Sequence, residues 1–310
     1  MDRILAGPAF AIDEIACLSA AQVLKQLAAL KPTPPSTETG SNLLYRLSVS
    51  AICHQINWDY LASRLHRAFE NSAITASSLS SISARDVDGW LFDYHRPERI
   101  RAAERAAMLR NVGDVISKNY FGDTGRVLSD ANGKLRGQNG FMSQLDNFFA
   151  FREDPLRKKS NVLVHELVRD GMARFEDESE ISPAIDYHIM RLYLRTGRVV
   201  PLHQVTHDLL KNDSSPRPRL VKLLRESVGE ALSLTAFYSA LTIPEVNGME
   251  WQIGRDICDR KTPRCLGPLN SDLSSFLTDK DKCPNTEFCR AFSQPDWRSL
   301  REPDLKKRFY

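Results

Sequence analysis

The chain has 310 residues and contains no run approaching the roughly 20 apolar residues that a membrane-spanning helix needs. No long apolar stretch follows Arg3, so we expect no secretory leader and a cytoplasmic protein. With only 15 glycines and 16 prolines, collagen-like and low-complexity classes are excluded. Neither charge sign is in large excess, and the net charge of +3 is too small to identify a partner.

Strand signals are also lacking, because no stretch alternates apolar and polar residues between turn dipeptides. Helical spacing replaces them wherever the chain is apolar. The sequence therefore predicts an all-α fold of one large or two modest domains. Three stripes carry the helical spacing: Leu61, Leu65, Ala68 and Phe69; Leu163, Val164, Leu167 and Val168; Ile185, Ile189 and Leu192.

Breaks are expected at residues 31–36, 77–83 and 212–218, which are rich in proline or serine. The first of them separates an N-terminal helical segment from the body of the chain. Residues 96–110 read as an arginine-rich helix on which Arg101 and Arg105 share one face. That face is suited to meet phosphates, but charge runs are most often solvated, and we expect a solvent-facing surface here.

Four of the six cysteines fall in the last fifth of the chain, at Cys258, Cys265, Cys283 and Cys289. In a reducing compartment such clusters bind metal more often than they form disulfides. The intervals of 6, 17 and 5 residues make two short loops that bring four thiolates to one centre. Four thiolates suit tetrahedral zinc or a [4Fe–4S] cluster, and the spacing leaves both open. The other two, at positions 17 and 53, are expected to be small buried hydrophobic residues.

With its Gly254-Arg255 lead-in, this segment resembles the C-terminal cluster loop of endonuclease III and adenine-mismatch DNA glycosylases. These enzymes belong to the helix-hairpin-helix DNA glycosylase superfamily, and their loop has the pattern G-R-x-x-C-x6-C-x2-C-x5-C. The outer intervals agree, whereas 17 residues replace two in the middle. The resemblance implies a [4Fe–4S] cluster, with zinc as the alternative, that is structural and lies near DNA.

A second match is independent of the cysteines. Residues 185–197 fit the superfamily signature V-D-x-H-[VI]-x-R-[VL]-x-x-R-x-G, in which a catalytic aspartate opens a helix. An aspartate at a helix start is held ionised by the helix dipole and free amides. It can then stabilise the positive charge on a sugar whose N-glycosidic bond breaks, or activate water. A simple capping aspartate is the alternative. Six positions agree with the signature: Asp186, His188, Ile189, Arg191, Arg195 and Gly197.

Upstream of Asp186, most of the superfamily has a glycine-containing hairpin, L-P-G-[VI]-G-x-K-x-A, which binds a phosphate. In bifunctional members its lysine forms a Schiff base with the sugar. The hairpin glycines are absent here, and Lys158 and Lys159 lie in the corresponding neighbourhood. A neighbouring cation lowers the pKa of a lysine, as a nucleophilic lysine requires. Two solvent-facing lysines at a helix start explain the pattern equally well.

The run from Asp154 to Lys159 also resembles the queuosine-salvage nucleoside hydrolases, which share the glycosylase-like architecture and keep a D-P-L-x-K-[KR] stretch. A further segment resembles the glycosylase I-L-S-Q-Q-T segment at the mouth of the base pocket. Its aromatic and amide groups suit an enzyme that flips a base, although a core tryptophan and capping polar residues are the alternative. The base-pocket candidates are His54, Gln55, Asn57 and Trp58.

Together the resemblances imply an all-α, two-lobed helix-hairpin-helix glycosylase fold. Residues 1–42 form an N-terminal helical segment and Pro-rich linker, residues 43–150 a central lobe, and residues 151–310 a lobe that packs with the N-terminal segment. The implied function is excision of a modified base from DNA by a monofunctional, monomeric hydrolase. The alternatives are a queuosine-salvage-like N-ribosyl hydrolase acting on a free nucleoside or nucleotide and a non-catalytic nucleic-acid-binding module.

Overall fold

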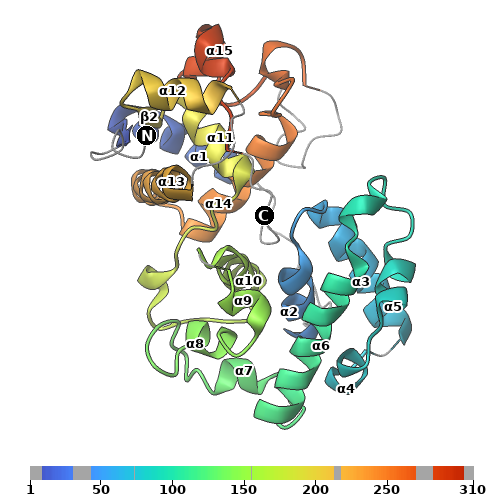
Figure 1. Ribbon diagram of the computed structural model, residues 1–310. Coiled ribbons are helices and arrows are strands. Elements are labelled where there is room, and N and C mark those ends of the chain that lie inside the picture. The colour runs from blue at the N-terminus through green and yellow to red at the C-terminus, as the bar shows by residue number, and fades with distance from the viewer. Residues whose placement is uncertain are drawn as a thin grey trace. The chain divides into compact units, whose positions relative to one another are not determined.

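The computed structural model describes residues 9–30, 43–72, 74–154, 156–212, 218–269 and 282–303. These residues form two compact units (Figure 1). Unit 1 contains the described residues up to 30 and from 182 onward. Unit 2 contains the described residues between 43 and 181.

Unit 1 is built around α11, whose apolar side chains are buried among the neighbouring helices. Helix α1 packs along α13, and α14 packs on α11 and α13. Strands β1 and β2 pair antiparallel, with Phe10 opposite Pro201 and Ile12 opposite Val199. The elements are β1 (Phe10–Ile12), α1 (Glu14–Leu30), α11 (Tyr187–Thr196), β2 (Val199–Pro201), α12 (Gln204–Lys211), α13 (Pro218–Ser239), α14 (Ile243–Asp256), a 3-10 turn η4 (Arg264–Leu266), α15 (Arg290–Ser293) and α16 (Pro295–Arg298).

Unit 2 is built around α6, which packs against α2, α4 and α5, while α10 packs on α2 (Figure 1). The α6 side chains Met108, Leu109 and Val112 are buried in its core. The elements are α2 (Leu43–Ile52), α3 (Trp58–Ser72), α4 (Ala76–Ser80), α5 (Ala84–Trp90), η2 (Pro97–Arg99), α6 (Ala102–Asn119), α7 (Arg126–Ser129), α8 (Phe141–Leu145), α9 (Phe149–Arg152), α10 (Lys158–Arg169) and η3 (Glu178–Glu180).

The all-α prediction is confirmed at the level of fold class, since the described residues are mostly helical. The β1–β2 pair was not predicted, because three residues are too few to show a period of two. The predicted stripes lie inward, with Val168 half-buried and the other stripe residues buried, and Cys17 and Cys53 are buried as expected. None of the helices within the described ranges is both long and apolar enough to cross a bilayer.

The division between the units falls after Ile181, whereas the sequence placed a boundary after Ala150. Residues 151–181 belong to unit 2 because α9 and α10 pack on α2. The N-terminal helix joins the C-terminal elements in unit 1, through its packing on α13. Residues 31–42, where the Pro-rich linker was predicted, lie outside the described part of the chain.

The expectation of a solvated arginine face on residues 96–110 is wrong for Arg105. Its side chain is fully buried and donates to the backbone oxygens of Arg99, Ile100 and His54. Arg101 is not helical, since it has a left-handed backbone (φ 47°) just before α6. Arg105 therefore joins two backbone segments, residues 99–100 and His54, because a buried guanidinium needs acceptors for its donors.

Candidate functional site

Asp186 lies at the start of α11 with an extended backbone (φ −115°, ψ −174°), as the sequence predicted. Its Oδ1 atom accepts hydrogen bonds from the backbone N–H groups of His188 at 2.8 Å and Ile189 at 3.0 Å. These two amides belong to the first turn, where a helix has no internal acceptors. The side chain is buried, so the carboxylate is fixed by the helix that it caps.

The second oxygen of this carboxylate has a partner on another helix. Trp251 of α14 donates its indole Nε1–H to Asp186 Oδ2 at 2.9 Å. The guanidinium of Arg255 lies 4.3 Å from the centroid of the Trp251 ring, and the His188 ring lies edge-on at 6.1 Å. Both oxygens of the carboxylate thus accept hydrogen bonds, and the group lies at the positive end of the α11 dipole.

The backbone that leads into Asp186 is held by two further side chains. Asn247 of α14 accepts from the backbone N–H of Ala184 at 2.8 Å through its Oδ1. Arg225 of α13 donates to the backbone oxygen of Ile185 at 2.6 Å. Both side chains are buried. The position of Asp186 therefore depends on α13 and α14 as well as on α11.

All four cysteines of the predicted metal loop line a single pocket in unit 1. The guanidinium-bearing side chains of Arg195 and Arg298 line it too. Short turns bring the thiols there: Arg264 N–H donates to Ile257 O at 2.9 Å, and Cys289 N–H donates to Asn285 O at 2.9 Å. Within the described ranges, no three Cys, His, Asp or Glu side chains converge into a site for a single metal ion.

The chemistry of these thiols is set by burial and by one another. Burial raises the pKa of Cys283 well above its usual range. Burial, and then the neighbouring Cys258, raise the pKa of Cys289 to about 11, and the same two causes raise that of Cys265. Metal ligation requires thiolates, and a bound metal deprotonates a coordinating thiol. The four sulfurs that share one cavity are the donor set that a four-thiolate metal centre needs.

Two arginines of α11 hold the backbone around the first cysteine. Arg191 donates to the backbone oxygens of Cys258 and Gly254, and pairs with the buried Glu302 at 2.7 Å. Arg195 donates to the backbone oxygen of Asp259 at 2.6 Å and lies 3.5 Å from the Cys258 sulfur. The helix that begins at Asp186 therefore also organises the cysteine loop. The two sequence matches describe one connected structure.

Each of the two sequence matches contains a glycine, and each glycine is required there for a different steric reason. Gly197 has a left-handed backbone (φ 84°) that ends α11, and an added Cβ would lie 2.5 Å from the Arg290 side chain. At Gly254 an added Cβ would lie 2.8 Å from the backbone oxygen of His188. Only a residue without Cβ allows α14 to approach the first turn of α11 this closely.

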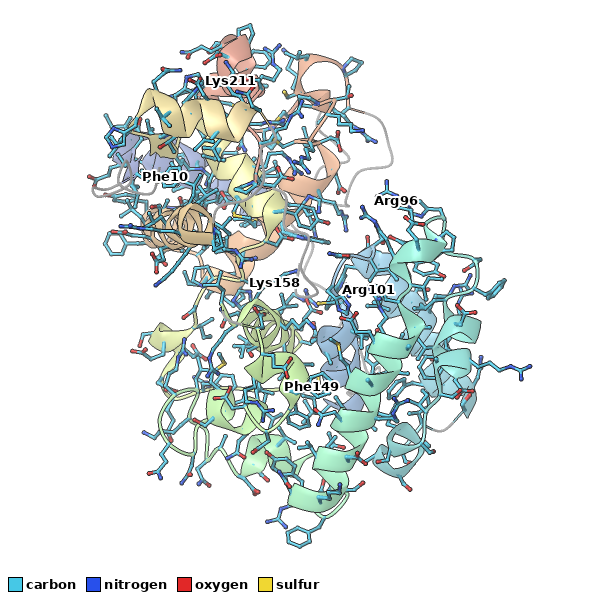
Figure 2. The ribbon with its side chains drawn as sticks, viewed as in Figure 1. Phe10, Arg96, Arg101, Phe149, Lys158 and Lys211 are labelled. Atoms are coloured by element: carbon cyan, nitrogen blue, oxygen red, sulfur yellow. The ribbon has the colours of Figure 1, made fainter. Side chains whose placement is uncertain are left out.

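In unit 2, Lys159 is fully buried at the start of α10. Its Nζ donates to the backbone oxygen of Ala51 at 2.6 Å, and its backbone N–H donates to Asp154 Oδ2 at 2.8 Å. Burial lowers the pKa of Lys159 to about 8. The explanation by solvent-facing lysines is therefore wrong for Lys159. Lys158 is half-buried beside it, at the end of unit 2 where Arg101 also lies (Figure 2).

The four residues of the predicted base-pocket segment differ in burial and in hydrogen bonding. His54 is buried, and its Nε2 lies 3.4 Å from Glu104 Oε1, while neither ring nitrogen makes a hydrogen bond. Burial and then the charge of Lys159 lower the pKa of His54 far below its usual range, so the ring is neutral. Asn57 is exposed and caps α3, with Oδ1 accepting from Tyr60 N–H at 2.9 Å. Gln55 and Trp58 are half-buried, so Trp58 is not a core residue.

The structure thus places the predicted site residues in two groups. Asp186 and the four cysteines belong to unit 1, and the lysines and segment 54–58 belong to unit 2. Trp251 lies seven residues before Cys258 and contacts Asp186 directly, and its role was not predicted from the sequence. Its only signal is helical spacing with Gly254, since residues three apart share a face.

Comparison with models of known protein families gives no match, and comparison with curated proteins gives none either.

Proposed function

We propose that the protein hydrolyses an N-glycosidic bond and excises a modified base from DNA, as a member of the helix-hairpin-helix glycosylase superfamily. The observation that carries this proposal is the environment of Asp186. A buried carboxylate is fixed by two backbone amides and by the Trp251 indole, at the start of the helix that holds the cysteine loop. Both motifs that suggested the family therefore meet in one local structure.

The chemistry follows from the ionised carboxylate. As the bond between sugar and base lengthens, positive charge develops on the sugar ring. A carboxylate held in place stabilises that charge without reorganising, which lowers the barrier more than a mobile group would. The same carboxylate can accept a proton from an attacking water molecule. Asp186 is the residue to which we assign both roles.

We assign the metal centre to Cys258, Cys265, Cys283 and Cys289, and we prefer a [4Fe–4S] cluster to zinc. The resemblance of the loop supports this preference, and the four cysteines that line one pocket are the number of ligands that such a cluster takes. A centre there supplies folding energy to the loop. Arg195, close to the Cys258 sulfur, offsets part of the thiolate charge.

Lysine chemistry decides whether a strand-cleaving step follows. Lys159 has a lowered pKa, which suits a nucleophile, but its Nζ is buried and bonded to the Ala51 carbonyl. We therefore propose a monofunctional hydrolase in which water, not lysine, attacks the sugar. Borohydride treatment during turnover should then trap no covalent protein–DNA adduct. A trapped adduct that disappears in Lys158→Ala or Lys159→Ala would overturn this part of the proposal.

A specific observation favours the second candidate, a queuosine-salvage-like N-ribosyl hydrolase. Asp154 and Lys159 of the D-P-L-R-K-K run are both buried, and Asp154 Oδ2 accepts a hydrogen bond from the Lys159 backbone N–H. His54 lies close enough for the charge of Lys159 to affect its pKa. A nucleoside hydrolase would need Asp186 for the same chemistry and would not need DNA.

The proposal is tested by incubating the protein with DNA that contains a panel of modified bases and identifying released bases by mass spectrometry. Asp186→Asn should abolish release while substrate binding is retained, because a neutral amide cannot offset the developing charge. The matched control is Asp13→Asn, since Asp13 also caps a helix of unit 1, accepting from Ala16 N–H at 3.0 Å. Full activity in Asp186→Asn would remove this residue from the mechanism.

The candidates differ in salt dependence. Binding to duplex DNA releases counterions and should weaken steeply between 50 and 200 mM salt, by roughly 1,000-fold or more for several phosphate contacts. Binding of a free nucleoside should change little. Base release from nucleosides or nucleotides but not from DNA would favour the ribosyl hydrolase. Tight, salt-dependent DNA binding without release from any substrate would favour a non-catalytic binding module.

A further inference from the structure

We infer that Trp251 is the positioning residue for Asp186, and that one face of α14 is built to hold it there. This inference rests on the proposed function, since it assigns a role to the carboxylate of the same site. Asp186 Oδ1 is engaged in capping α11, and the Trp251 indole donates to the other oxygen, Oδ2, at 2.9 Å. The cap directs Oδ1 toward the first turn of α11, and the indole bonds to the other oxygen. A donor on a second helix fixes the direction of Oδ2.

The sequence of α14 explains how the indole reaches Asp186. Asn247, Trp251 and Gly254 are spaced by four and three residues, so they share one face of the helix. Asn247 bonds to Ala184 N–H before Asp186, and Gly254 packs against the backbone oxygen of His188 after it. Trp251 lies between these two contacts along α14. This face of α14 therefore contacts the backbone both before and after Asp186.

The start of α14 is itself well defined. Thr242 caps the helix, and the Glu245 side chain accepts from the Thr242 backbone N–H at 2.8 Å, which completes a capping box. Within the helix, Arg255 stacks on the Trp251 ring at 4.3 Å and pairs with Asp256 at 2.6 Å. The indole thus has a stacking partner on one ring face while its N–H is directed at the carboxylate. A purely structural tryptophan would need no acceptor that belongs to the site.

The test removes the N–H group and keeps the ring. Trp251→Phe retains an aromatic ring against Arg255 and His188, while Asp186 Oδ2 loses the hydrogen bond from the indole. The matched control is Trp297→Phe in the same unit, whose ring packs on Arg290 at 4.7 Å and His207 at 5.9 Å. Each variant is assayed for kcat, KM and the pH dependence of base release. The carboxyl group of Asp186 is also titrated by ¹³C NMR in the full-length protein.

A hydrogen bond to the charged form of an acid favours that form, so its loss should make Asp186 protonate at higher pH. We expect kcat of Trp251→Phe to fall about tenfold or more with little change in KM. The acidic limb of the pH profile and the NMR titration midpoint should both move to higher pH. Trp297→Phe should match the wild type. Identical profiles and midpoints in both variants would overturn the inference.

A second variant covers the case in which Trp251→Phe does not fold. Gly254→Ala keeps the indole but forces α14 away from the His188 carbonyl, so it should raise the titration midpoint of Asp186 in the same direction. The NMR titration also separates the two claims. If the wild type cleaves no substrate, the proposed function fails, and the titration midpoints alone decide whether Trp251 positions the carboxylate.

Discussion

The Asp186 carboxylate caps α11 through Oδ1 and binds Trp251 through Oδ2, and these contacts contribute to stability whatever the protein's activity. Asparagine caps helices about as well as aspartate, whereas alanine cannot cap. Either substitution would also remove the Trp251 N–H acceptor, because the one oxygen of asparagine serves the cap. Substitutions at one position therefore separate the structural contribution from the chemical one.

We expect Asp186→Ala to lower the free energy of unfolding by about 1 to 2 kcal/mol, while Asp186→Asn should lower it by less, because asparagine keeps the cap and loses only the bond from Trp251. Urea unfolding followed by circular dichroism measures both. Asp13→Ala is the control, because it removes a cap from α1 without touching α11. Equal losses in Asp186→Ala and Asp186→Asn would contradict the capping account.

The buried Lys159 leads to a prediction of how folding stability depends on pH. Burial lowers its pKa from 10.5 to about 8, so between these values the unfolded chain binds a proton that the folded chain does not. Stability contributed by this group therefore rises with pH across that window and is lowest below about pH 8. The full change is roughly 3 kcal/mol, from 1.36 kcal/mol per unit of pKa.

Thermal unfolding between pH 7.5 and 10 tests this sign. The wild type should gain stability with pH relative to Lys159→Met, in which the titrating amine is gone. Lys134→Met is the matched control, since Lys134 is an exposed lysine of the same unit, 3.3 Å from Glu176. The account of Lys159 fails if the Lys159→Met and Lys134→Met variants follow the same pH dependence.

At the scale of the element, α11 joins the candidate acid to the candidate metal centre. Arg191 and Arg195 point from this one helix to the backbone of residues 254–260. Arg191 also pairs with Glu302, and both side chains are almost fully buried. A buried ion pair is costly to break on one side, because the remaining charge stays in a low-dielectric interior.

Arg191→Leu should therefore destabilise unit 1 by about 3 to 5 kcal/mol and lower the bound metal per chain. The double variant Arg191→Leu/Glu302→Leu should recover part of the stability, because no unpaired carboxylate remains. Its metal content should stay low, since the bonds to the Cys258 and Gly254 carbonyls are still missing. Differential scanning calorimetry and metal analysis measure the two effects. A single variant as stable as the double would contradict the role of the ion pair.

The sequence predicted much of α11 and of the cysteine loop, because local signals specify both. Asp186 opens the helix, Gly197 ends it, and the four cysteines line one cavity. Trp251 was not predicted as a site residue, and Arg105 was wrongly expected to face solvent, both for the same physical reason. Their roles depend on which distant backbone they meet, and neither the Trp251–Asp186 nor the Arg105–His54 contact leaves a pattern in the local sequence.

At the scale of the whole molecule, the chain enters unit 1, leaves it for unit 2 and returns at residue 182. The sequence anticipated the return, because the resemblance paired the N-terminal helix with the C-terminal lobe. The sequence placed the boundary between the units after residue 150 and not after residue 181. The amphipathic pattern of residues 151–181 is compatible with packing in either core. Packing of α10 on α2 places these residues in unit 2. The spacing of apolar residues along a helix does not specify which other helix it packs against.

Separate cores predict separate responses to metal removal. The four cysteines belong to unit 1 alone, so loss of the centre should withdraw folding energy from that unit. In hydrogen–deuterium exchange after chelation or acid treatment, protection should fall in α11, α14 and residues 257–265. Protection of α2, α3 and α6 should be retained, because α6 and its neighbours keep their own buried core.

The control is Cys17→Ser, which alters a buried cysteine of unit 1 that does not line the cavity. It separates general weakening of this core from metal loss. Equal loss of protection in both units would show that they unfold as one.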